Sequence, residues 1–101
     1  MMSKTIILIP SRLSASRLPG KPLLKINGLP IICHVFKKAK KTNIGQVVVC
    51  AEDKEIVDEI KKIGGEAILT SSHHKSGSDR IFEGFKKLEL KNFDYILNLQ
   101  G

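Results

Sequence analysis

The order in which apolar runs follow one another limits the fold of this chain more than any other feature. Short continuous apolar runs alternate with stretches in which apolar residues recur every three or four positions. Runs at 5–10, 46–51, 66–69 and 95–100 predict strands, and periodic stretches within 31–41, 53–64 and 76–88 predict helices. This alternation predicts an α/β fold, a Rossmann-like half-domain with a parallel sheet and helices on both faces.

The connections between these elements carry signals of their own. Residues 11–22 predict a polar loop, and 23–26 a short extended piece that turns at Asn27–Gly28. Asp53 is a suitable N-cap for the second helix, and Gly64–Gly65 is suited to end it. The first helix carries its lysines opposite its apolar residues, which is typical of a solvated surface.

The segment that follows the first strand holds most of the candidate site residues. Sheets of this kind bind ligands at the carboxyl ends of their strands, where 11–22, 51–53 and 70–78 are expected to lie. Arg12, Arg17 and Lys21 could hold phosphate oxygens, and Gly20 would let an anion approach closely. The segment is not a Walker A loop because Pro22 follows Lys21. On spacing alone, a solvated basic loop explains it equally well.

The second candidate loop runs from His73 to Arg80. Arg80 is expected in the first helical turn, where a cation opposes the helix dipole, so a bound anion or the Asp79 carboxylate would offset it. Neighbouring side chains in an extended segment point apart, so His73 and His74 are not expected to share a metal ion.

Composition excludes several classes of protein. The net charge of +7 suits a polyanionic partner, but five aromatic residues and no Trp argue against a stacking platform for nucleic acid. No segment has the length of a membrane span or the pattern of a signal peptide. Cys33 and Cys50 belong to no metal motif, so we expect reduced core residues in a cytoplasmic protein.

Four segments together resemble one enzyme family, the 3-deoxy-manno-octulosonate cytidylyltransferases, or CMP-Kdo synthetases. The segments are Ile9–Leu23, Asn27–Ile32, His74–Arg80 and Asn98–Gly101. The resemblance covers essentially the whole chain, and the His74–Arg80 segment favours Kdo over sialic acid as the sugar. It implies a nucleotidyltransferase fold and transfer of CMP from CTP to Kdo with release of pyrophosphate, in the cytoplasm, for lipopolysaccharide biosynthesis.

The resemblance also implies roles for individual residues. Arg12 and Lys21 would act in catalysis and hold the triphosphate together with Arg17. Pro10 and Ser11 would frame the nucleotide through their backbone, although the family more often has Ala at position 11. The remaining nucleotide-binding residues, which would select the base and ribose or orient the sugar, are Ser76, Arg80 and Gln100.

Part of the family's site is expected outside this chain. The aspartate that binds Mg²⁺ in the family would directly follow Gly101, so no metal ligand is expected within the chain. An unprotected apolar strand at 95–100 also predicts further sheet. Residues 1–101 are therefore interpreted as the truncated N-terminal, CTP-binding part of the domain, without appreciable activity alone; the complete enzyme is expected to be a homodimer.

Three alternatives stay open at this point. The parent enzyme could activate another sugar acid, such as sialic acid. The chain could be a non-catalytic nucleotide-binding remnant of a decayed or split gene. A basic nucleic-acid-binding module is the third, and the lack of aromatic residues and the buried parallel strands argue against it.

Overall fold

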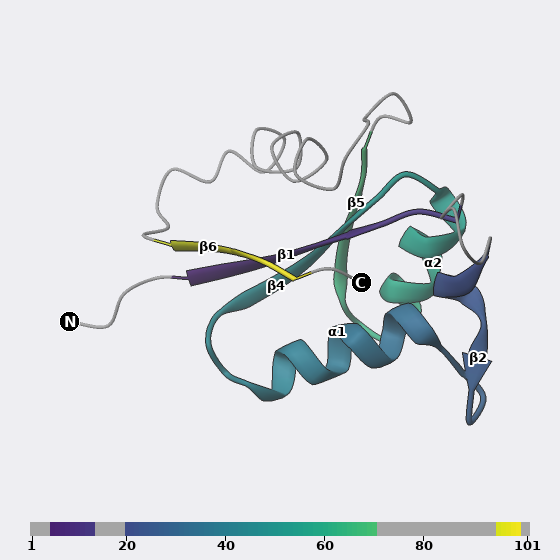
Figure 1. The fold of residues 1–101 in the computed structure, drawn as a ribbon, viewed down its shortest axis with the longest axis horizontal. Coiled ribbons are helices and arrows are strands. Elements are labelled where there is room, and N and C mark those ends of the chain that lie inside the picture. Colours follow the sequence, from purple (N-terminus) through teal and green to yellow (C-terminus); the bar gives the residue numbers. More distant parts are fainter. Residues whose placement is uncertain (1–4, 14–19, 71–94, 100–101) are drawn as a thin grey trace.

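The computed structural model describes residues 5–13, 20–70 and 95–99 (Figure 1). The strands are β1 (Thr5–Ser11), β2 (Lys25–Ile26), β3 (Leu29–Pro30), β4 (Gln46–Ala51), β5 (Glu66–Leu69) and β6 (Tyr95–Asn98). The helices are α1 (Ile31–Lys41), α2 (Lys54–Lys62) and a short 3₁₀ helix, Lys21–Leu23. No helix in these ranges is long and apolar enough to cross a membrane.

Four strands form the main sheet in the order β5-β4-β1-β6, and every neighbouring pair is parallel. The first strand of the chain is therefore central and pairs with β4 through Ile7 and Val47 and with β6 through Thr5 and Tyr95. This arrangement confirms the predicted parallel sheet. The continuous apolar run of β1 is explained by burial on both faces, since Ile6 and Ile9 are both 0% exposed.

Both described helices cover the same face of the sheet (Figure 1). Ile7, Ile9 and Val49 pack on that face against the apolar stripes of α1 and α2. The opposite face carries a second buried cluster of Ile6, Leu8, Val48 and Cys50. The third predicted helix, within 76–88, lies outside the described residues, so a helix on the second face stays a prediction.

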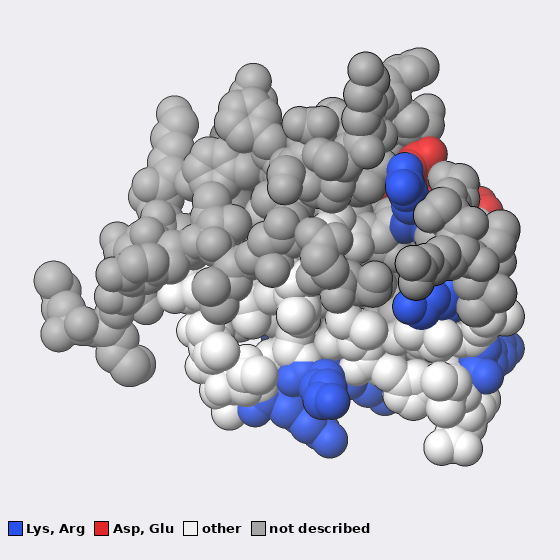
Figure 2. Space-filling model, in the orientation of Figure 1, with Lys and Arg blue, Asp and Glu red and all other residues white. Residues whose placement is uncertain are grey.

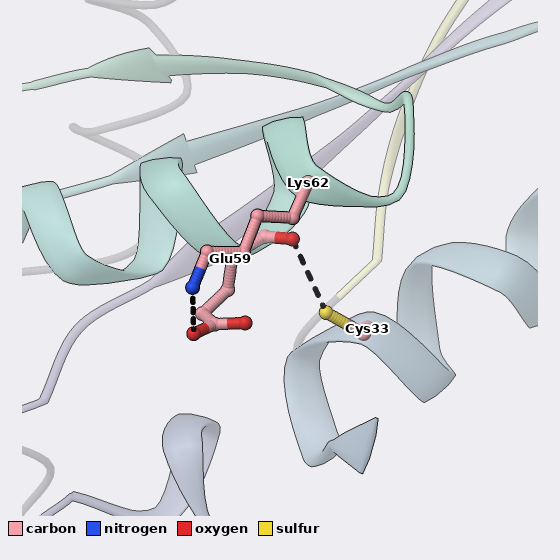
Figure 3. Close-up of polar contacts among 3 residues, drawn as sticks. All are labelled: Cys33, Glu59 and Lys62. Atoms are coloured by element: carbon pink, nitrogen blue, oxygen red, sulfur yellow. Dashed lines mark hydrogen bonds and ion pairs between the residues drawn. The ribbon is translucent and has the colours of Figure 1, made fainter.

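Helix α1 spans the predicted residues and packs against α2. Ile32, Cys33 and Phe36 are buried, and the lysines at 37, 38, 40 and 41 are exposed. The Cys33 thiol donates a hydrogen bond to the backbone carbonyl of Glu59 on α2 at 3.7 Å (Figure 3). Glu59 also forms an ion pair with Lys62 at 3.3 Å. Cys33 and Cys50 are both buried, which confirms that they are core residues.

Helix α2 ends at the glycine pair Gly64–Gly65, as predicted. The Gly65 N–H donates to the carbonyl of Ile60 at 2.9 Å, and the Gly64 N–H donates to Lys61 at 3.0 Å. Gly64 has a φ of 77°, which is the left-handed conformation that this type of helix end requires. Asp53 stands at the predicted N-cap position, but its side chain makes no capping hydrogen bond.

Three predicted boundaries were wrong, and the smallest difference is that β1 runs to Ser11, one residue further than predicted. Leu23 does not begin an extended piece, because Lys21–Leu23 forms the 3₁₀ helix, in which the fixed backbone angle of Pro22 is easily accommodated. The following β2–β3 hairpin does turn at Asn27 and Gly28, whose φ angles are 55° and 77°. The last strand ends at Asn98, two residues earlier than predicted.

Candidate functional site

The candidate site lies where the parallel strands end. Because β1, β4, β5 and β6 run in one direction, their carboxyl ends meet at one edge of the sheet. Hydrogen bonds continue the pairing past the strands: the Glu52 N–H donates to Ser11 at 3.1 Å, and the Thr70 N–H donates to Ala51 at 2.7 Å. The backbone pairing at this edge therefore continues for one residue past the ends of β4 and β5.

Two long-range bonds fix Leu13, which follows β1 by two residues. Its backbone N–H donates to the carboxylate Oδ2 of Asp53 at 2.8 Å. Its carbonyl accepts a hydrogen bond from the Gly20 N–H at 2.7 Å. Leu13 thus joins the start of the cationic segment both to the beginning of α2 and to the segment's own end.

The segment ends in the backbone geometry that its glycine was expected to provide. Gly20 has a φ of 81°, and a Cβ added there would meet no atom within 4 Å. Lys21 follows at once as the first residue of the 3₁₀ helix, and its side chain is exposed. The Gly20 carbonyl accepts the Leu23 N–H at 3.0 Å, so the chain turns tightly directly after Lys21.

Half of the predicted site residues can be placed. Pro10 and Ser11 are buried at the end of β1, and Arg12, directly after them, is half-buried. The hydrogen bond between Gly20 and Leu13 holds the backbone next to Lys21 close to the end of β1. The other predicted residues lie outside the described ranges: Arg17, Ser76, Arg80 and Gln100, together with His73 and His74.

Among the described residues, two buried hydroxyl groups at this edge have no hydrogen-bond partner. They are the Oγ of Ser11 and the Oγ1 of Thr70, on residues that are 7% and 4% exposed. Such a group loses its bonds to water without replacement, which costs about 1–3 kcal/mol. Ser11 occupies the position where the resembled family more often has Ala, which lacks this hydroxyl.

The distribution of charge is a signal that the sequence-based reasoning missed. The first 51 residues contain nine Lys and Arg residues and no Asp or Glu, whereas the remainder holds all ten acidic residues. In Figure 2 the blue surface gathers over α1 and around the β2 end of the molecule, and little red is visible on this face. This basic surface over α1 and the β2 end would suit a polyanionic partner.

The role of the Asp53 side chain is the other feature that sequence reasoning missed, although the residue stands at the predicted N-cap position. It was predicted as a helix cap, yet its carboxylate holds Leu13, forty residues earlier in the chain. Its place just after β4, at the same edge as Arg12, is the only sequence signal that points to this contact. Within the described residues, no group of three or more His, Cys, Asp or Glu could hold a metal ion.

Comparisons with known proteins show the family to which this chain belongs. A family model described as cytidylyltransferase matches residues 6–101. A 3-deoxy-manno-octulosonate cytidylyltransferase from Nitrobacter winogradskyi is 48% identical over 100 residues, which cover 98% of this chain and 39% of the relative. Its counterpart from Afipia carboxidovorans is 48% identical over 98 residues, which cover 96% of this chain and 40% of the relative.

A solved structure shows the same fold. CMP:2-keto-3-deoxy-manno-octonic acid synthetase complexed with CTP matches with a TM-score of 0.86 and 42% identity, over 97% of this chain and 40% of that chain. The parallel sheet with its helices is therefore that of this group of enzymes. The chain spans about 40% of the length of the curated relatives that it matches.

Proposed function

This chain belongs to the cytidylyltransferase family, and we propose that it forms the CTP-binding part of an enzyme that transfers CMP to 3-deoxy-manno-octulosonate. Support for the sugar comes from relatives that carry this name at 45–48% identity. Support for the nucleotide comes from the neighbouring structure, which is complexed with CTP.

The observation that carries the proposal is the position of Arg12. It follows the central strand directly, at the edge where such sheets bind ligands, and no acidic residue precedes it in the chain. Lys21 is brought to the same region through the bond between Gly20 and Leu13. A triphosphate carries about four negative charges, and forked Arg donors with a compact Lys charge suit its oxygens.

In the proposed reaction, a hydroxyl oxygen of the sugar attacks the α-phosphorus of CTP. The bond from that phosphorus to its bridging oxygen breaks, pyrophosphate leaves, and the hydroxyl proton is released. Arg12 and Lys21 would hold the triphosphate and offset its charge, while the backbone of Pro10 and Ser11 would border the nucleotide. Arg17, Ser76, Arg80 and Gln100 would complete nucleotide binding.

Four further parts of the proposal rest on the resemblance alone. We expect Mg²⁺ to assist the complete enzyme through ligands beyond Gly101, and the 101 residues by themselves to show no appreciable turnover. We also expect the complete enzyme to be a homodimer. Its product would feed lipopolysaccharide biosynthesis in the cytoplasm.

Calorimetric titration of the chain with CTP tests the nucleotide part. Arg12→Ala should weaken binding about ten- to hundredfold, because a hydrogen bond to a charged group contributes about 1.5–3 kcal/mol. Lys38→Ala is the matched control, since it removes one positive charge from an exposed position on α1. Equal losses of affinity in the two variants would show that the basic surface attracts CTP in a general way, and would contradict a specific site at Arg12.

A second titration tests the class of ligand. CTP should bind more tightly than a short RNA of equal charge, and inorganic triphosphate should compete with it. Preferential binding of RNA with a steep dependence on salt would contradict the proposal. Supplying CTP, Mg²⁺ and either Kdo or sialic acid to a full-length relative separates the two sugar acids.

A further inference from the structure

The bond between Asp53 and Leu13 uses a carboxylate in an unexpected way. Asp53 has the extended backbone of an N-cap residue, with φ −114° and ψ 132°, and it stands directly before α2. An Asp at this position usually accepts a hydrogen bond from the first helical turn, which contributes about 1 kcal/mol. Here no such bond forms, and Oδ2 accepts the Leu13 N–H at 2.8 Å instead.

Leu13 is held on both of its backbone groups. Asp53 takes the N–H, and the carbonyl accepts from Gly20 at 2.7 Å. Arg12 precedes Leu13 by one residue, and Lys21 follows Gly20 by one residue. Arg12 and Lys21, which are proposed to hold the triphosphate, therefore each lie one residue from the hydrogen bond between Leu13 and Gly20.

We propose that Asp53 is a positioning residue for nucleotide binding: it fixes Leu13 and, through it, the points from which Arg12 and Lys21 reach the triphosphate. This inference rests on the proposed function. Asp53 itself would not contact the nucleotide. Holding cationic groups in place before the ligand arrives lowers the entropy lost on binding, which raises affinity.

The direction in which the affinity for CTP changes on substitution of Asp53 distinguishes a positioning role from a purely electrostatic one. A carboxylate beside a site for a polyanion repels the ligand, so a purely electrostatic role predicts tighter CTP binding once Asp53 is neutralised. A positioning role predicts weaker binding whenever the bond to Leu13 is lost. It also predicts that a neutral side chain able to accept the same bond restores affinity.

Three variants of the whole chain distinguish these roles. Asp53→Asn keeps a carbonyl oxygen at the same distance from Leu13, whereas Asp53→Ala has no acceptor. Asp53→Ser is a good N-cap that is too short to reach Leu13, so it controls for a loss of helix stability. For each variant, we would measure the affinity for CTP by calorimetry, the exchange rate of the Leu13 amide by NMR, and thermal unfolding.

Asp53→Ala and Asp53→Ser should each bind CTP about tenfold more weakly and exchange the Leu13 amide about tenfold faster. Asp53→Asn should match the wild-type chain in both measurements. Weakened binding in Asp53→Asn equal to that in Asp53→Ala would overturn the proposal, as would unchanged or tighter binding in Asp53→Ala despite a faster Leu13 amide. In either case the proposed function would stand. Failure of the wild-type chain to bind CTP would overturn both.

Discussion

The thiol of Cys33, a residue that is 0% exposed, lies 3.7 Å from the backbone carbonyl oxygen of Glu59 and joins α1 to α2 (Figure 3). Burial raises the pKa of this thiol above its ordinary value, and the charge of Glu59 adds to the effect, while Lys37 partly offsets it. Since the thiolate is the reactive form, the folded protein should protect Cys33 from alkylation.

We expect a Cys50→Ala variant, which leaves Cys33 as the single cysteine, to react with a thiol reagent at pH 8 at least about tenfold more slowly when folded than in denaturant. Mass spectrometry of the labelled chain measures the rate. Folding favours the neutral thiol, so this part of the stability is present below the ordinary pKa and is lost as pH rises through the raised one. Cys33→Ala should therefore show a smaller decline in stability at alkaline pH.

Gly45 lies against the backbone of β1, so an added methyl group should be poorly tolerated. A Cβ there would overlap the carbonyl oxygen of Thr5 and lie 2.7 Å from its carbonyl carbon. Because Thr5 pairs with Tyr95 and the next residue, Ile6, pairs with both Gln46 and Ile96, Thr5 cannot easily shift. We expect Gly45→Ala to lower the free energy of unfolding by about 3 kcal/mol, at the upper end for overpacking.

Gly64→Ala serves as the comparison for Gly45→Ala in urea unfolding. A Cβ at Gly64 meets no atom within 4 Å, so only its left-handed backbone, with φ 77°, opposes the change. The expected cost is about 1 kcal/mol. Equal losses in the two variants would show that contact with Thr5 does not limit position 45.

The unpartnered hydroxyls at the edge of the sheet predict substitutions that stabilise the protein. Ser11→Ala and Thr70→Val each remove a buried group that makes no hydrogen bond, so each should raise the free energy of unfolding by up to about 1 kcal/mol. Thr42→Val should do the opposite, because the Thr42 hydroxyl donates to Ala39 at 2.6 Å. Chemical denaturation of the three variants measures whether the free energy of unfolding rises or falls in each.

The same Ser11→Ala variant bears on the site. The proposed contact of Ser11 with the nucleotide is through its backbone, so the affinity for CTP should stay within about twofold of the wild-type value, close to the precision of such comparisons. A large loss would assign a role in binding to the hydroxyl itself.

The sequence predicted the sheet and its two described helices well because their signals are local and repeated. The stripe of α1 and the valine run of β4 predicted 31–41 and 46–51, which are the observed bounds. The 3₁₀ helix at Lys21–Leu23 was missed because a single tight turn has no periodicity to detect. Parallel order followed from topology rules rather than from any one residue.

The candidate site was predictable only in part. Arg12 and Lys21 were identified because cations after a buried strand are visible in the sequence, and the structure places both near the carboxyl edge. The bond between Asp53 and Leu13 was not predictable, because a hydrogen bond across forty residues leaves no local pattern. The roles of Arg17, Ser76, Arg80 and Gln100 stay predictions.

The central place of β1 has a consequence for how the protein is made. A ribosome releases Thr5–Ser11 well before one neighbour of that strand, since Tyr95, which pairs with Thr5, lies much further along the chain. During that interval a newly made, highly apolar strand can be paired on one side at most. We therefore expect nascent chains to need shielding and refolding to be slow, since the pairing of β1 with β6 joins segments far apart in the sequence.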